Sequence, residues 1–179
     1  MIDNFEDGLV GGSPIGGAVT KSANVTASVA DLGPAADAQH ETRALRVAGK
    51  FDGETIEWSI PAAHGDVEAY EWLSVRIGRT SAQAAGGLKV QLRNDGVWSA
   101  EVEVADHGEI PTPLAMCPPA PYSCAAPPVY DHMGTVRVPL DAFGDRDDVE
   151  AVRLVFRDDS VRKTFLVDTL EFAEWIYKP

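Results

Sequence analysis

Apolar and polar residues alternate with a period of two along most of this chain. The alternating segments are 45–47, 55–60, 73–77, 88–93, 97–104, 136–138 and 151–157. Successive side chains of a strand point to opposite faces, so this pattern is typical of strands with one buried face. Asn94–Asp95–Gly96 is a hairpin signal, because these residue types tolerate a positive φ. The pattern predicts an all-β antiparallel β-sandwich or barrel of about ten strands, with one helical turn near Ala142–Phe143.

The same alternation sorts side chains between the core and the outer surface. Trp58 and Trp98 fall in the apolar phase of their segments and are expected in the core. The side chains expected outside are Lys89, Gln91, Arg93, Ser99, Glu101, Glu103, Arg153, Val155 and Arg157. If these strands share a sheet, their outer face is a polar groove whose arginines can bind carboxylates bidentately. Alternatively, the arginines pair across strands with Glu101 and Glu103 and form a solvated face.

The length and the charge of the chain restrict the classes of function that we expect for this protein. The 179 residues suit a single domain spanning 1–179, and the 45% hydrophobic content is typical of a globular chain. The net charge of −13 disfavours nucleic acid and anionic membranes as partners. No apolar run approaches the roughly 18 residues of a membrane span. The chain has no phosphate-binding glycine loop, no G-x-S-x-G and no H-E-x-x-H, so an enzyme is not expected.

Residues 109–130 form a proline-rich segment that cannot be a central strand. We expect a long ordered loop there, of the kind that often carries function. Both cysteines, Cys117 and Cys124, lie in it, and a disulfide between them would place the protein in an oxidising compartment. Two free thiols in a cytosolic protein are the alternative, and a metal set completed by His132 is conceivable.

Four motifs occur in an order that resembles a known family. They are Ile2–Asp3–Asn4–Phe5–Glu6–Asp7–Gly8, Leu45–Arg46–Val47–Ala48–Gly49, Val136–Arg137–Val138–Pro139–Leu140 and Phe165–Leu166–Val167–Asp168–Thr169–Leu170–Glu171–Phe172. Their order and spacing resemble the carbohydrate-binding modules of the galactose-binding-like jelly roll, most of all family 11 modules. The resemblance covers nearly the whole chain and implies a jelly roll. It also implies a secreted or cell-surface protein.

The resemblance further implies a structural calcium ion that ties the first strand to the last. Carried over by position, its carboxylates are Glu6 and Asp168, with Glu41 and carbonyls around 39–42 completing the shell. Calcium prefers six to eight oxygen ligands, which these groups can supply. On the residues alone, Asp168 could instead bond backbone amides or pair with an arginine.

The function we expect is a non-catalytic module of a secreted protein that binds a polysaccharide or glycoconjugate on its concave sheet. An acidic sugar is compatible with the arginines. The expected contacts are Lys89, Gln91, Arg93, Arg153 and Arg157, with Tyr130 and His132 from the loop. The chain has only four tyrosines, whereas family 11 modules use several exposed ones in the groove. The alternative is a structural or adhesive module of an extracellular assembly without a sugar site, contacting other domains of a larger protein.

Overall fold

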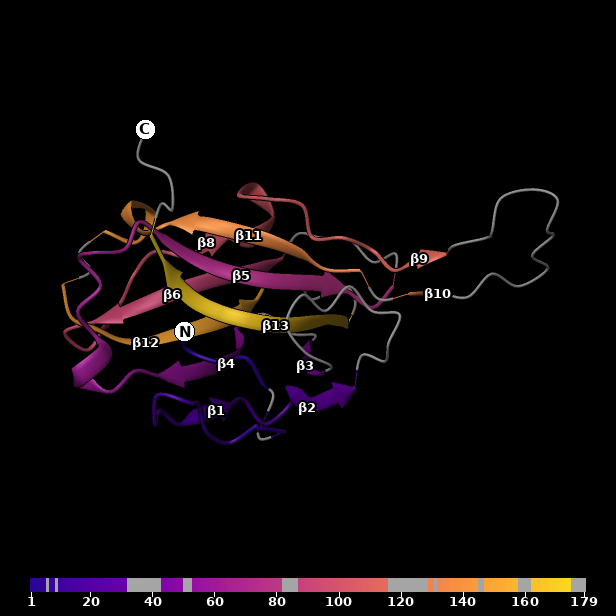
Figure 1. Ribbon diagram of the computed structural model, residues 1–179, viewed down its shortest axis with the longest axis horizontal. Coiled ribbons are helices and arrows are strands. Elements are labelled where there is room, and N and C mark those ends of the chain that lie inside the picture. Colours follow the sequence, from indigo (N-terminus) through magenta and orange to yellow (C-terminus); the bar gives the residue numbers. More distant parts are fainter. Residues whose placement is uncertain are drawn as a thin grey trace, which may run out of the picture.

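The computed structural model describes residues 1–5, 7–8, 10–31, 43–49, 53–81, 87–115, 129–130, 132–144, 147–157 and 162–174. These residues form two antiparallel sheets and a small ribbon (Figure 1). None of the helices in these ranges is long and apolar enough to cross a bilayer.

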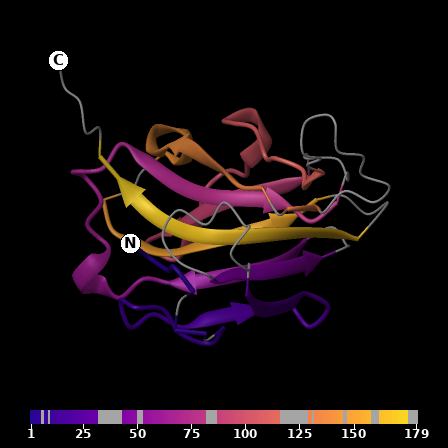
Figure 2. The ribbon, with the colours of Figure 1, turned by 45° about the vertical axis from the view of Figure 1, so that its right-hand side comes forward.

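One sheet has six strands in the order β1-β4-β12-β6-β7, with β8 also paired to β6. Its strands are β1 (Val19–Lys21), β4 (Glu54–Ser59), β12 (Val149–Phe156), β6 (Leu88–Asn94), β7 (Val97–Trp98) and β8 (Val102–Glu103). The other sheet has five strands in the order β11-β5-β13-β3-β2. They are β11 (Gly134–Pro139), β5 (Trp72–Arg79), β13 (Lys163–Ala173), β3 (Arg43–Gly49) and β2 (Thr26–Asp31). Figure 2 shows the long strand β13, in yellow, lying between β5 and β3.

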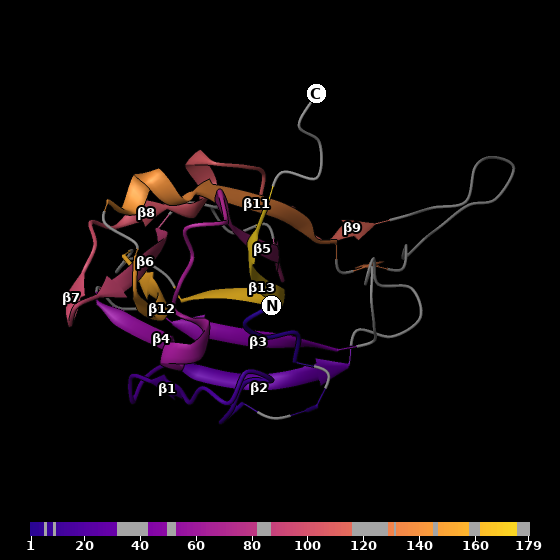
Figure 3. The same cartoon turned by 60° about the vertical axis from the view of Figure 1, so that its left-hand side comes forward.

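The remaining elements are short. Three 3-10 helices, η1 (Ala62–His64), η2 (Val104–Asp106) and η3 (Leu140–Phe143), lie between strands. The ribbon pairs β9 (Leu114–Ala115) with β10 (Val129–Tyr130) and lies away from both sheets (Figure 3).

The inner faces of the two sheets form one apolar core. Trp58 of β4, Phe156 of β12 and Leu92 of β6 face Phe165 of β13 and Val47 of β3 among its buried members. These side chains occupy alternate positions of their strands, as a sandwich with two outer faces requires. The prediction of an all-β jelly-roll sandwich is therefore confirmed, and so is the core position of Trp58.

Local predictions can be checked in the same way. The hairpin at Asn94–Asp95–Gly96 is confirmed, because Asp95 and Gly96 both have positive φ between β6 and β7. The helical turn near Phe143 is confirmed as η3. Strands β1 and β2 lie in a stretch with no marked alternation and were not predicted individually. In the proline-rich segment, β9 and β10 pair where the sequence indicated only a loop.

The N-terminal segment joins the two sheets through Asp3. Its backbone forms a bridge with Leu170 of β13, in which Leu170 N donates to Asp3 O at 2.9 Å. Its carboxylate accepts hydrogen bonds from Phe5 N at 3.0 Å and from Trp58 Nε1 of β4 at 3.2 Å. Asp3 is only 1% exposed, and this burial raises the pKa of its carboxyl to about 6.

This shift predicts a pH dependence of stability. The folded pKa of Asp3 lies above the unfolded value, so the stabilising contribution is complete below about pH 4 and is lost as the pH rises through about 6. We expect the free energy of unfolding to lose about 2 kcal/mol from Asp3 over this interval. Urea denaturation of wild type and Asp3→Asn at several pH values measures it, because the amide does not titrate.

Asp31→Asn is the matched control, since the Asp31 side chain is 82% exposed. Its pH profile should follow that of wild type. A profile of Asp3→Asn that kept the wild-type slope between pH 4 and 6 would contradict the assignment.

Candidate functional site: the outer face of the six-stranded sheet

The central row of this face crosses three strands. Glu57 of β4, Arg153 of β12 and Gln91 of β6 lie opposite one another. Arg153 donates from Nε and Nη2 to Gln91 Oε1, at 2.9 and 2.7 Å. Gln91 in turn donates from Nε2 to Ser99 O at 2.5 Å. Gln91 is buried although it lies on the outer side of the sheet, so this row is a fixed polar network.

Trp98 lies on this face, and the prediction that it belongs to the core is wrong. The Arg153 Cζ atom lies 3.9 Å from the centroid of the Trp98 ring, and Arg93 Cζ lies 5.4 Å from it. Both distances are typical of a cation–π contact. Trp98 is opposite Arg93 on β6 and therefore shares its face.

The cause is a one-residue register shift within the predicted strand 97–104. Trp98 pairs with Arg93, whereas Glu103 pairs with Lys89, so the six residues 98–103 lie opposite the five residues 89–93. An extra residue of this kind reverses the faces of the side chains before it. The chain leaves the sheet between β7 and β8, where Ser99 Oγ accepts a hydrogen bond from Leu92 N at 3.1 Å. Alternation alone could not show this break.

The other two arginines of the face, Arg93 and Arg157, have carboxylate partners. Arg93 donates to Glu150 at 2.9 Å and to Glu57 at 3.3 Å. Arg157 Nε lies 2.8 Å from both carboxylate oxygens of Glu101, which Nη2 also contacts. These hydrogen bonds from Arg157 hold the pKa of Glu101 below its usual range.

Glu103 lies opposite Lys89 and accepts a hydrogen bond from Gly87 N at 2.9 Å. Burial nevertheless raises the pKa of Glu103. Burial also lowers the pKa of the Arg153 guanidinium, opposed by the charges of Glu57 and Glu101. The face thus combines four cationic side chains, Lys89, Arg93, Arg153 and Arg157, with four carboxylates, Glu57, Glu101, Glu103 and Glu150.

The structure therefore brings together five of the predicted contact residues: Lys89, Gln91, Arg93, Arg153 and Arg157. It adds Trp98, Glu57 and Glu150, which the sequence analysis missed. Glu57 lies between the apolar residues Ile56 and Trp58, so the alternation of the sequence predicts its outward position. Its pairing with Arg93 could not be predicted, because it depends on which strands are neighbours.

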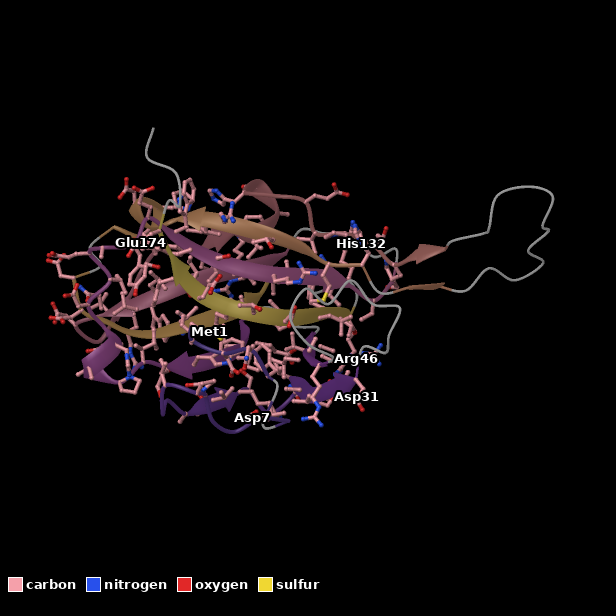
Figure 4. The ribbon with its side chains drawn as sticks, viewed as in Figure 1. Met1, Asp7, Asp31, Arg46, His132 and Glu174 are labelled. Atoms are coloured by element: carbon pink, nitrogen blue, oxygen red, sulfur yellow. The ribbon has the colours of Figure 1, made fainter. Side chains whose placement is uncertain are left out.

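His132 and Tyr130 do not join this face. His132 is exposed and lies two residues before β11, a strand of the five-stranded sheet. Figure 4 labels it on the right of the view. Its carbonyl oxygen packs against Gly78 of β5, where a Cβ would lie only 2.3 Å away. Tyr130 belongs to β10 of the separate ribbon, opposite Leu114. The predicted disulfide between Cys117 and Cys124 lies outside the described residues and stays a prediction.

Asp168, the predicted calcium ligand, forms a buried ion pair. It is the extra residue where the register of β13 against β5 shifts, and its Oδ2 lies 3.0 Å from Arg76 Nε. The side chains are 2% and 8% exposed. This ion pair is the alternative role considered for Asp168 from the sequence, and its role as a calcium ligand stays a prediction. Glu6 and Glu41 lie outside the described residues, and the residues within them include no group of three metal-binding side chains.

Comparisons with known proteins support the fold. Neither a protein-family model nor a curated protein matches the sequence. Among solved structures, the family 11 carbohydrate-binding module from Clostridium thermocellum in complex with a β-1,3-1,4-mixed-linked tetrasaccharide matches with a TM-score of 0.59. The alignment has 12% identity and covers 97% of this chain and 94% of that one.

Two further structures match at similar levels. The family 11 module of the cellulosomal cellulase Lic26A-Cel5E of the same organism has a TM-score of 0.60 and 12% identity, covering 99% and 95% of the two chains. The CBM22-1 xylan-binding domain of Xyn10C from Paenibacillus barcinonensis has a TM-score of 0.53 and 12% identity, covering 97% and 94%. At these identities the likeness establishes the jelly-roll fold of carbohydrate-binding modules.

The Arg76–Asp168 pair yields a stability prediction. Asp168→Asn should lower the free energy of unfolding by about 3 kcal/mol, because it leaves Arg76 buried without its counter-charge. Asp31→Asn, which removes an exposed partner of Arg43, should cost less than about 1 kcal/mol. Chemical denaturation of both variants measures the difference.

Repeating the wild-type experiment with calcium and with a chelator tests the metal prediction. Equal free energies of unfolding with calcium and with the chelator would show that Asp168 acts in the ion pair and does not hold calcium. A calcium-dependent increase that Asp168→Asn abolishes would show instead that this carboxylate holds calcium.

Proposed function

We propose that this protein is a non-catalytic carbohydrate-binding module of a secreted or cell-surface protein. Its site is the outer face of the six-stranded sheet, centred on Arg153. The fold supports this proposal, because the solved structures that share it include modules described as holding a mixed-linked tetrasaccharide and as xylan-binding. A module of a cellulosomal cellulase is also among them.

The observation that carries the proposal is the position of Trp98. Its ring contacts Arg153 and also borders a hollow of about 280 Å³ at the edge of the sheet. The other residues that line this hollow are Leu92, Asn94, Asp95, Val97, Ser99 and Phe143. A sugar ring has apolar C–H faces and a rim of hydroxyl groups. An aromatic ring beside amide, carboxylate and guanidinium groups suits both parts of such a ligand.

The charge balance of the face favours a neutral polysaccharide. Each guanidinium except that of Arg153 contacts a carboxylate, and Arg153 is bound to the neutral Gln91. An acidic sugar would have to displace Glu57, Glu101 or Glu150 from its arginine, whereas hydroxyl groups can add to the network without breaking an ion pair. We therefore replace the acidic ligand considered from the sequence with a neutral one at this face.

The same pairing also favours a second candidate function. A face whose charged groups satisfy one another needs no ligand, which suits a structural or adhesive module. The two functions differ in whether Trp98 contributes to binding.

Affinity electrophoresis against mixed-linkage glucan, xylan and polygalacturonate distinguishes them. We expect one of the neutral polymers to retard the protein and Trp98→Ala to weaken the affinity at least about tenfold, equivalent to about 1.4 kcal/mol. Arg153→Ala should weaken it as well, because it releases both the ring and Gln91.

Trp72→Ala is the matched control, because Trp72 is a partly exposed tryptophan on β5 of the opposite sheet. It should bind like wild type, and thermal melts should show that all variants are folded. Folded wild-type protein that neither mixed-linkage glucan nor xylan retards would overturn the proposal in favour of the structural module.

A further inference from the structure

A second polar pocket lies on the outer face of the five-stranded sheet. Its volume is about 320 Å³. It is lined by Thr26, Ser28, Arg46, Ala48, Thr80, Arg162 and Thr164. Two guanidinium groups and four hydroxyl groups thus surround a single alanine, on a different sheet from the site described above.

Strand register explains why these residues meet. Thr26 of β2, Ala48 of β3 and Thr164 of β13 form one row across three strands, and Ser28 and Arg46 lie opposite each other in an adjacent row. The intervening residues Leu45, Val47 and Phe165 point into the core, so the lining residues must point outward. Ala48 has the smallest side chain of its row, so it forms the floor of the pocket between the larger side chains of Thr26 and Thr164.

The two arginines are placed differently from those of the six-stranded sheet. Arg162 reaches across the end of β3 and donates from Nη2 to Thr26 Oγ1 at 2.6 Å and to Ala48 O at 3.4 Å. Arg46, which is labelled in Figure 4, is exposed, and the strand register places it on the other side of Ala48 along β3. Among the described residues, no carboxylate forms a salt bridge with either arginine. Arg43, three residues before Arg46, pairs with Asp31.

We propose that this pocket binds the oxyanion of an acidic sugar unit, a carboxylate of a uronic acid or a sulfate ester. Guanidinium groups bind such oxyanions through paired, charge-assisted hydrogen bonds. The threonine and serine hydroxyls can donate to and accept from the hydroxyls of the same sugar. Two neighbouring arginines also place positive charge at this pocket on a chain of net charge −13.

Calorimetric titration at low salt tests the proposal with two probes, an oligogalacturonate and a sulfated galactan oligosaccharide. We expect saturable binding of at least one of them, and the probe that binds identifies carboxylate or sulfate as the oxyanion. Arg46→Gln combined with Arg162→Gln should weaken it at least tenfold. Arg43→Gln removes the same charge from the same strand outside the pocket and should stay within twofold of wild type.

Arg153→Ala separates this site from the proposed neutral-sugar site. It should leave binding of the acidic probe unchanged, and the double variant should leave retardation by neutral polymers unchanged. The proposal is overturned if neither probe binds, if Arg43→Gln weakens binding as much as the double variant, or if only Arg153→Ala weakens it. Thermal melts of the exposed double variant confirm that it is folded.

Discussion

The packing of the two inner faces against each other is the constraint on which the rest of this structure depends. Phe156 of β12 and Phe165 of β13 meet across the core with ring centroids 6.2 Å apart. Their contact requires Gly49 of β3, because a Cβ there would lie 2.6 Å from the Phe156 ring. Once these residues are buried, their neighbours along each strand must point outward. The composition of both outer faces follows from this packing.

The two outer faces use charge in different ways. On the six-stranded sheet, Arg93 and Arg157 are held by carboxylates and Arg153 by Gln91, so the guanidiniums form a rigid, nearly neutral surface. On the five-stranded sheet, Arg76 is buried with Asp168, while Arg46 is exposed beside hydroxyl groups. The net charge of −13 therefore does not predict the charge of either face. A ligand at a face interacts with the local charges there, and these depend on which side chains pair.

The chain ends are tied by ordinary backbone and side-chain bonds. Asp3 bridges Leu170 in one sheet and accepts a hydrogen bond from Trp58 in the other. Phe5 packs edge-on against the same tryptophan, with ring centroids 6.3 Å apart. This junction joins the N-terminal segment to β13 and β4. Its buried carboxylate makes the junction sensitive to pH, since burial disfavours the charged form.

The sequence by itself determined the fold class, the hairpin at Asp95–Gly96 and the outward phase of Lys89, Gln91, Arg93 and Arg153. These depend on local properties, namely the period of two and the backbone freedom of turn residues. Only the tertiary structure decided that Trp98 lies on the outer face and not in the core, because one extra residue between β7 and β8 shifts the register. It also decided which carboxylate each arginine meets, and that Arg46 and Arg162 share a pocket. Such pairings join residues far apart in the chain, and strand order, which no local pattern contains, brings them together.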